Sequence, residues 1–138
     1  MAANLVICSI PDNVKDEFKA VRFSKETTMT ALFLKISRET HELEVAEKLT
    51  DSSIEEIQDE LPSQQPRFVL MSWMKKHEDG RCSYPMTLVY YCPSGCSPEL
   101  QMLYAGSRNF IANECQLTKN LEIRDIEELT MELLDSKF

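Results

Sequence analysis

The sequence has little glycine and little positive charge, and it has no long hydrophobic run. Three glycines in 138 residues are too few for a glycine-rich loop that binds nucleotide phosphates. Aspartate and glutamate outnumber lysine and arginine by 23 to 15, which gives a net charge of −8. That charge disfavours nucleic acids and anionic membrane surfaces as partners, because both are polyanions. No apolar run approaches the roughly 20 residues of a membrane-spanning helix, and the N-terminus lacks a signal peptide, so we expect a cytoplasmic protein.

Motifs of enzymes and metal sites are also missing from the sequence. Cys92 and Cys96 are spaced as C-x-x-x-C, but no second close pair of ligands follows them, and the two histidines lie in separate turns. There is no thioredoxin-type C-x-x-C, no nucleophile elbow and no zinc-protease motif. The sequence therefore predicts a non-enzymatic protein without cofactor or metal; the alternative, a thiol or metal enzyme, requires bound zinc or a reactive cysteine. We expect reduced thiols at Cys8, Cys82, Cys92, Cys96 and Cys115, an odd number mostly in or beside apolar segments.

The hydrophobic pattern predicts one domain over residues 1–138, with elements in the order α-β-β-α-β-β-α-β-α. Hairpins supply antiparallel strand pairs, and the long helix before the last strand can cross over to make a parallel pair. The fold class is therefore α/β (α+β), with a central mixed, mostly antiparallel sheet between helices. The predicted elements are a helix over 13–22 after Asp12, a strand over 29–36, a more exposed strand around 43–46, a short helix after 51–53, strands over 67–74 and 84–92 joined by a turn over 75–81, a helix over 97–112, a strand around 121–123 and a C-terminal helix from Asp125.

The helix predicted over 97–112 has one apolar face and one unusual face. Ser97 is a good N-cap, and Pro98 suits the first helical position, where its missing N–H costs nothing. Gly106 inside a helix costs about 1 kcal/mol relative to alanine, and a merely solvated face gives no reason for it. We interpret the second face as a protein-docking surface with Met102 as a flexible anchor; the alternative is a helix buried on both sides in its own domain. The apolar face is Leu100, Leu103, Tyr104, Ser107, Phe110 and Ile111, and the second face is Gln101, Met102, Ala105, Gly106, Asn109 and Ala112.

Two further groups of charged residues are candidates for a secondary contact. The helix over 13–22 has a basic stripe, because its basic residues recur at helical spacing. The Asp79-Gly80 pair predicts a hairpin turn with a charged tip in water. Each group is explained equally well as an ordinary solvated surface. The basic stripe is Lys15, Lys19 and Arg22, and the hairpin tip is Lys75, Lys76, Glu78, Asp79 and Arg81.

The segment 101–108 resembles the long helix of the actin-depolymerising-factor homology family. In that family the motif Met-x-Tyr-Ala-x-Ser-Lys forms the actin-facing helix. The matching residues here are Met102, Tyr104, Ala105, Ser107 and the basic Arg108. One branch of the family has three further signatures, which occur here at 60–69, 79–85 and 95–102. The resemblance extends from Leu5 through the last helix and implies a single domain of this family.

What the resemblance implies about partners depends on two missing positive charges. Cofilin-like members have lysines one and three positions before the helix methionine, where this chain has Gln101 and Glu99. A nearby opposite charge in a partly dry interface contributes on the order of 1–4 kcal/mol, so losing both lysines disfavours acidic actin. The branch that shares the three signatures is likewise uncharged or acidic there. The resemblance therefore implies binding to the actin-related protein 2/3 complex, the branch nucleator, with weak or no direct binding to actin.

The implied activity is inhibition of branched nucleation and debranching of actin filaments. The alternative is a cofilin-like protein that binds actin monomers or filaments and severs them. We expect a monomer in the branched networks of the cytoplasmic actin cytoskeleton, with the nucleus as a further location. The resemblance and the helix pattern together assign the primary contact to Asn4, Leu5, Glu99, Gln101, Met102, Ala105, Gly106 and Arg108.

Overall fold

The computed structural model describes residues 9–22, 29–37, 39–62, 65–115, 117 and 120–137. The predicted order of elements is confirmed, with a short ladder added in the hairpin and a 3₁₀ helix added near the C-terminus. The elements are α1 (Asp12–Arg22), β1 (Met29–Ile36), β2 (Leu43–Ser52), α2 (Ile54–Glu60), β3 (Arg67–Ser72), β4 (Lys75–Lys76), β5 (Cys82–Ser83), β6 (Met86–Tyr91), α3 (Pro98–Glu114), β7 (Asn120–Ile123), the 3₁₀ helix η2 (Ile126–Glu128) and α4 (Met131–Lys137).

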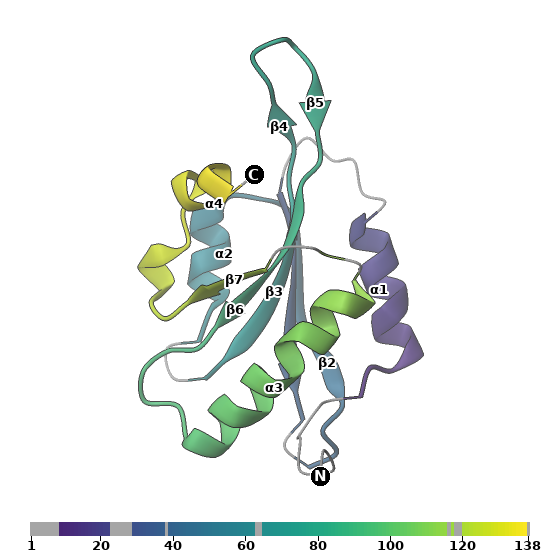
Figure 1. Ribbon diagram of the computed structural model, residues 1–138, viewed down its shortest axis with the longest axis vertical. Helices are drawn as coiled ribbons and strands as arrows, with labels where there is room; N and C mark the ends of the chain where they lie inside the picture. Colours follow the sequence, from purple (N-terminus) through teal and green to yellow (C-terminus); the bar gives the residue numbers. More distant parts are fainter. Residues whose placement is uncertain are drawn as a thin grey trace.

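A five-stranded sheet in the order β2-β1-β3-β6-β7 forms the centre of the molecule. Its first four strands pair antiparallel, whereas β6 and β7 pair parallel. The long helix α3 makes the crossover between those parallel strands, as the sequence predicts. Figure 1 shows α1 and α3 on one side of the sheet and α2 and α4 on the other. The predicted mixed sheet between helices is therefore confirmed.

Each face of the sheet has its own hydrophobic core, because successive side chains of a strand point to opposite faces. Leu32 and Leu34 of β1 pack towards α1 and α3, while Phe33 packs towards α2 and α4. Tyr90 and Tyr91 of β6 divide between the two cores in the same way. The inner strand β1 has apolar residues at consecutive positions, because both of its sides are covered. The edge strand β2 is mostly exposed.

The helices beside the sheet follow the predicted periodicity. Val14, Phe18 and Val21 form the buried side of α1. Ser53 caps α2, since its hydroxyl accepts a hydrogen bond from the Glu56 amide at 3.2 Å, and Ile57 is fully buried. Both helices therefore present a single apolar stripe to the sheet.

The C-terminal helix begins later than the sequence predicts. At Asp125, where the sequence predicts the start of that helix, the Glu128 carboxylate accepts a hydrogen bond from the Asp125 amide at 3.1 Å, and this capping interaction belongs to the 3₁₀ helix η2. Leu129 then adopts extended backbone angles, and its side chain is fully buried. The 3₁₀ helix η2 therefore ends before Leu129, whose side chain enters the core, and α4 starts at Met131.

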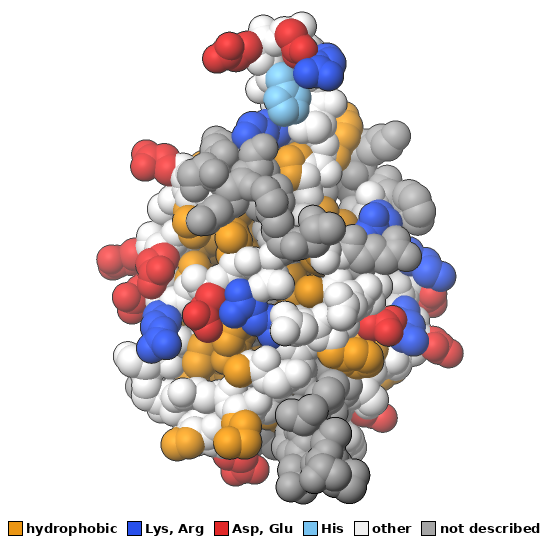
Figure 2. Space-filling view, in the orientation of Figure 1, with side chains coloured by type: hydrophobic (Ala, Val, Ile, Leu, Met, Phe, Trp, Pro, Cys, Tyr) orange, Lys and Arg blue, Asp and Glu red, His pale blue; other side chains and the backbone are white. Residues whose placement is uncertain are grey.

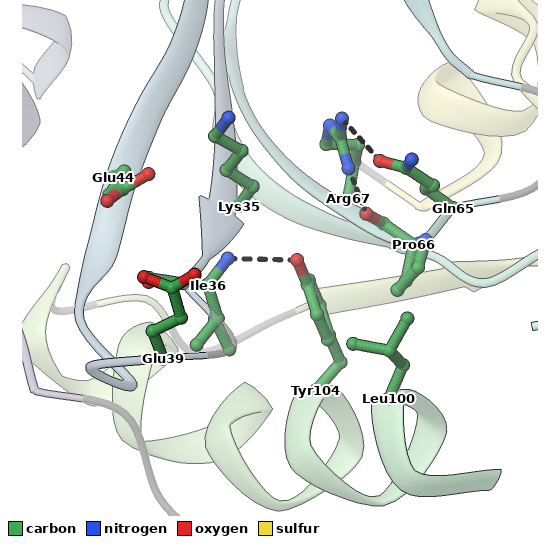
Figure 3. A pocket seen from close by; sticks show the side chains of 10 residues that line it. Lys35, Ile36, Glu39, Glu44, Gln65, Pro66, Arg67, Leu100 and Tyr104 are labelled. Atoms are coloured by element: carbon green, nitrogen blue, oxygen red, sulfur yellow. Dashed lines mark hydrogen bonds between the residues drawn. The ribbon is translucent and has the colours of Figure 1, made fainter. Parts of the chain in front are cut away.

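A buried hydrogen bond fixes α3 on the sheet. The Tyr104 hydroxyl accepts a hydrogen bond from the Ile36 amide at 2.8 Å, at the end of β1 (Figure 3). The Tyr104 ring also stacks on Phe68 of β3, with centroids 5.3 Å apart and an interplanar angle of 22°. One side chain therefore satisfies a backbone donor and sets the position of α3 against two strands.

Replacing Tyr104 by phenylalanine should keep the ring stacking and leave the Ile36 amide without its acceptor. An unsatisfied buried donor costs about 1–3 kcal/mol, so Tyr104→Phe should lower the free energy of unfolding by that amount. Equilibrium denaturation with urea measures the change. Tyr84→Phe is the matched control, because Tyr84 is 38% exposed. Equal destabilisation by both substitutions would contradict the role given to the Tyr104 hydroxyl.

Candidate functional site

The candidate site is built on α3, whose start follows the predicted capping pattern. The Ser97 hydroxyl accepts a hydrogen bond from the Leu100 amide at 3.3 Å, and Pro98 occupies the first turn. Leu103, Tyr104, Ser107 and Ile111 are buried against the sheet. Leu100 and Phe110 are half-buried, so the predicted apolar face is confirmed as the side of α3 that packs on the sheet.

The opposite side of α3 is exposed, as a docking surface requires. Met102 is 68% exposed, the largest value among the exposed large hydrophobic residues in the described part of the chain. Along much of α3, Figure 2 shows uncharged and hydrophobic atoms, with basic and acidic side chains beside the middle of the helix and further charged side chains towards the margins of the view. The alternative of a helix buried on both sides is therefore wrong. We call the following residues the exposed α3 face: Glu99, Gln101, Met102, Ala105, Gly106 and Asn109.

Ala112 does not belong to this face, contrary to the sequence prediction. It is 2% exposed and packs in the core shared with α1. The chain after α3 turns back over the last turn of the helix, where the Leu117 amide donates a hydrogen bond to the Ala112 carbonyl at 2.9 Å. The exposed α3 face therefore ends one turn earlier than the helical pattern indicates.

A small hollow of about 200 Å³ adjoins the exposed α3 face. Gln101 and Ala105 form its helix side, and Glu122 and Arg124 form the side given by β7 and the residue after it. The Gln101 amide nitrogen also donates a hydrogen bond to the Cys96 carbonyl at 2.8 Å, which fixes that side chain at the start of the helix. The surface beside Met102 is therefore hollowed on the β7 side.

The Arg108 side chain is less exposed than the residues of the exposed α3 face, because it contacts the sheet. Its Nε donates a hydrogen bond to Asn120 Oδ1 at 2.5 Å, and its Nη1 lies 3.7 Å from Glu122 Oε1. Its guanidinium carbon also lies 5.9 Å from the ring centroid of Tyr90. The Arg108 side chain is 26% exposed, so the residue joins α3 to β6 and β7 as well as bordering the exposed face.

The basic stripe on α1 is divided by a contact that the sequence does not reveal. The Arg22 guanidinium donates a hydrogen bond to the Cys115 carbonyl at the end of α3. A cation at this position satisfies a terminal carbonyl and complements the negative end of the helix dipole. Lys15 is half-buried and Lys19 is exposed. Arg22 is therefore engaged in holding α1 and α3 together.

The hairpin tip projects away from the body of the protein (Figure 1). Asp79 and Arg81 form an ion pair within the tip, with Arg81 Nε and Asp79 Oδ2 2.6 Å apart. At its base His77 Nε2 and Ser83 Oγ are 2.8 Å apart. The other charged tip residues, Lys76 and Glu78, are exposed, and Lys75 is half-buried. A long projecting tip is accessible to a partner, while Asn4 and Leu5 of the predicted contact lie outside the described residues.

A larger pocket of about 530 Å³ lies at the end of β1, beside the start of α3 (Figure 3). Leu100 and Tyr104 give it apolar lining, and Arg67 donates hydrogen bonds to the Pro66 carbonyl at 2.8 Å and to Gln65 at 3.0 Å. The sequence does not indicate this pocket, because its lining comes from separate strands and from α3. The remaining charged lining residues are Lys35, Glu39 and Glu44.

Two thiols of the described residues, Cys96 and Cys115, lie in surroundings that raise their pKa. Burial raises the pKa of the Cys115 thiol to about 12, and burial together with neighbouring Cys92 raises the pKa of Cys96. Both thiols therefore stay protonated at neutral pH. Within the described ranges no three His, Cys, Asp or Glu residues are grouped for a metal ion, and no helix is long and apolar enough to cross a membrane.

Comparison with known proteins assigns the chain to a family. Residues 7–138 match the cofilin/tropomyosin-type actin-binding proteins, and the chain belongs to this family, which makes it an actin-regulating protein. It is 41% identical to human glia maturation factor beta over 137 residues, covering 99% of this chain and 96% of the relative. It is 42% identical to the Drosophila melanogaster glia maturation factor over 131 residues, covering 95% of each. The solution structure of the Caenorhabditis elegans glia maturation factor is 67% identical, covers both chains completely and superposes with a TM-score of 0.85. Within its family the chain is thus similar to the glia maturation factors.

The contacts of Arg108 predict a structural cost when they are removed. Arg108→Ala should lower the free energy of unfolding by about 1–2 kcal/mol, because a half-buried, charge-assisted hydrogen bond and the packing of the side chain are lost. Chemical denaturation measures the change. Lys19→Ala removes the same charge from an exposed position of α1 and should change stability by less than about 0.5 kcal/mol. If the two variants unfold at the same denaturant concentration, the Arg108 contacts do not stabilise the fold.

Proposed function

We propose that this protein is a non-enzymatic ligand of the actin-related protein 2/3 complex that inhibits branched nucleation and promotes debranching of actin filaments. The observation that carries the proposal is the exposed α3 face, where Met102 lies among residues that are small, amide-bearing or acidic and none is basic. An exposed apolar anchor on a rigid helix is a common basis for protein recognition. The family and the glia maturation factor relatives support a partner from the actin system.

Charge favours an actin-related subunit over actin itself. Cofilin-like relatives have lysines at the positions of Glu99 and Gln101, and both of these residues are exposed here on the first turns of α3. A partner chosen by charge complementarity is therefore less acidic at this surface than actin. The hollow between Gln101, Ala105 and Glu122 gives a subunit room to insert a side chain beside Met102.

The proposed mechanism is a shift between two conformations of the branch complex. A protein bound in the cleft that a daughter filament also uses favours the conformation that holds filaments weakly. The size of the shift equals the difference between its affinities for the two conformations. The fold is suited to this action, since α3 is fixed on the sheet through Tyr104 and docks without reordering.

A second contact would strengthen this arrangement. The hairpin tip projects beyond the end of the sheet (Figure 1), and we propose that it contacts a neighbouring subunit while α3 is docked. Its Lys76, Glu78 and Arg81 are exposed, as is Lys19 of the basic stripe. Asn4 and Leu5 of the N-terminal segment belong with the exposed α3 face to the proposed primary contact. The hairpin tip and the basic stripe are secondary to it.

A cofilin-like activity, binding and severing of actin filaments, is the second candidate. The family description as actin-binding and the basic Arg108 on α3 favour it. The two candidates separate in an assay that follows branch disassembly on preformed networks, beside severing of unbranched filaments. Faster loss of branches with intact unbranched filaments supports the proposal, and strong co-sedimentation with unbranched filaments at physiological salt overturns it.

Met102→Ala should weaken binding to the branch complex by ~1–3 kcal/mol, as truncation of an interface anchor does. Its thermal unfolding should stay close to that of the wild type, because Met102 is 68% exposed. Val45→Ala is the matched control, since Val45 is an exposed apolar residue on β2. Titration against fluorescently labelled complex measures the affinity, and lower stability at unchanged affinity would contradict the proposal.

Restoring the two missing charges should move the partner preference towards actin. The double variant Glu99→Lys with Gln101→Lys places two cations on the exposed α3 face, and each is worth on the order of 1 kcal/mol near an acidic surface. We expect measurable binding to unbranched filaments that declines as salt is raised. Co-sedimentation at two salt concentrations tests this, with Thr50→Lys plus Glu55→Lys, two exposed positions away from α3 that give the same change in net charge, as the control. Equal gains by both double variants would reject a site-specific effect.

A further inference from the structure

Arg108 lies on the flank of α3 that borders the hollow. Gln101, Ala105 and Arg108 are separated by four and three residues, so they follow one another along one side of the helix. Gln101 and Ala105 line the hollow together with Glu122. A guanidinium at position 108 that turned away from the sheet would therefore stand next to the exposed α3 face.

Three side chains of β6 and β7 contact the Arg108 guanidinium and keep it against the sheet. Asn120 Oδ1 accepts the Nε–H at 2.5 Å, and the Glu122 carboxylate lies 3.7 Å from Nη1. The face of Tyr90 lies beneath the guanidinium, at 5.9 Å from its centroid. Burial and a hydrogen bond with Cys92 raise the pKa of the Tyr90 hydroxyl, so Tyr90 stays uncharged and the only opposite charge among these three groups is that of Glu122.

We propose that Asn120 and Glu122 are positioning residues for partner choice, because they keep the Arg108 cation against the sheet and out of reach of an acidic subunit on the exposed α3 face. The proposal rests on the proposed function, since it assumes that α3 is the docking surface. It adds a second source of selectivity to the missing lysines at 99 and 101. The chain retains a cation at this flank of the helix and neutralises it with its own β7.

The size of the expected gain in affinity follows from how exposed Arg108 and Glu122 are. The Glu122 side chain is 45% exposed, so solvent screens its attraction for Arg108 and only a modest effect is expected. A released cation at the rim of an interface acts mainly on the association rate and makes binding dependent on salt. We expect a gain of about two- to tenfold in affinity for an acidic surface. Arg124, the cation that lines the hollow, is unchanged in every variant and sets the baseline.

The experiment measures co-sedimentation of the purified full chain with unbranched actin filaments, an acidic polymer, at low and at physiological salt. Asn120→Ala releases Arg108 without changing the net charge, and Glu122→Gln releases it by removing the opposing carboxylate. Each variant should bind filaments about two- to tenfold more tightly than the wild type, most strongly at low salt. Neither gain should remain when Arg108→Ala is added, because a double-mutant cycle isolates the effect that passes through Arg108.

The controls separate a positioning role from a general change of charge or stability. Glu127→Gln removes a carboxylate from η2 and should leave filament binding unchanged. Asn120→Asp adds an acceptor with a charge, should hold Arg108 more firmly and should give no gain. The Arg108 Nε–H signal in a nitrogen-15 spectrum should shift in the two releasing variants, provided that their thermal unfolding shows a folded chain.

Gains that persist in the Arg108→Ala background would overturn the proposal, and so would unchanged filament binding in both folded releasing variants. If both releasing variants fail to fold, equal binding by Asn120→Asp and the wild type supports the proposal, and tighter binding by Asn120→Asp overturns it. Titration of the wild type against the branch complex, run in parallel, tests the proposed function separately. A wild type that does not bind the complex, together with gains that depend on Arg108, would refute the proposed function and keep this inference.

Discussion

The position of α3 depends on the bond between the Tyr104 hydroxyl and the Ile36 amide. This bond ties the first half of the helix to the end of β1, and the stacking of Tyr104 on Phe68 ties the same residue to β3. At the other end, Arg22 of α1 holds the Cys115 carbonyl. A helix fixed at both ends against the sheet presents its remaining side to solvent as a rigid surface. That constraint explains how Met102 can stay 68% exposed in an ordered helix.

Some polar side chains of α3 are bound within the protein, and others are exposed to solvent. Ser107 is buried, Arg108 is bound to Asn120 and Glu122, and Gln101 holds the Cys96 carbonyl. The exposed α3 face itself has no lysine or arginine, although the protein belongs to a family of actin-binding proteins. Because charge complementarity sets specificity more than affinity, the partner proposed for this face is one that needs no cation there. Arg108, which borders the face, is paired with Glu122 of β7.

Periodicity predicted the elements well where burial is decided by neighbours along the chain. In α1, the helical spacing of Val14, Phe18 and Val21 matches the side that is buried. In β1, consecutive apolar residues match a strand that is covered on both faces. The same reasoning failed at chain reversals. Ala112 has the spacing of a surface residue but is covered because the chain folds back at Leu117, and Leu129 interrupts a regular capping pattern because the core takes its side chain.

The sequence by itself determined the order of the elements, the mixed sheet and the apolar face of α3, since these follow from side-chain period and local capping. Its motifs were also enough to indicate the family. Only the tertiary structure decided which polar side chains near α3 are free to meet a partner. Arg108 and Arg22 look alike in the sequence as exposed helical cations, yet both are engaged by residues from other elements. The groups that hold them lie 12 and 93 residues away along the chain, and no local pattern encodes a contact that exists only when distant segments pack together.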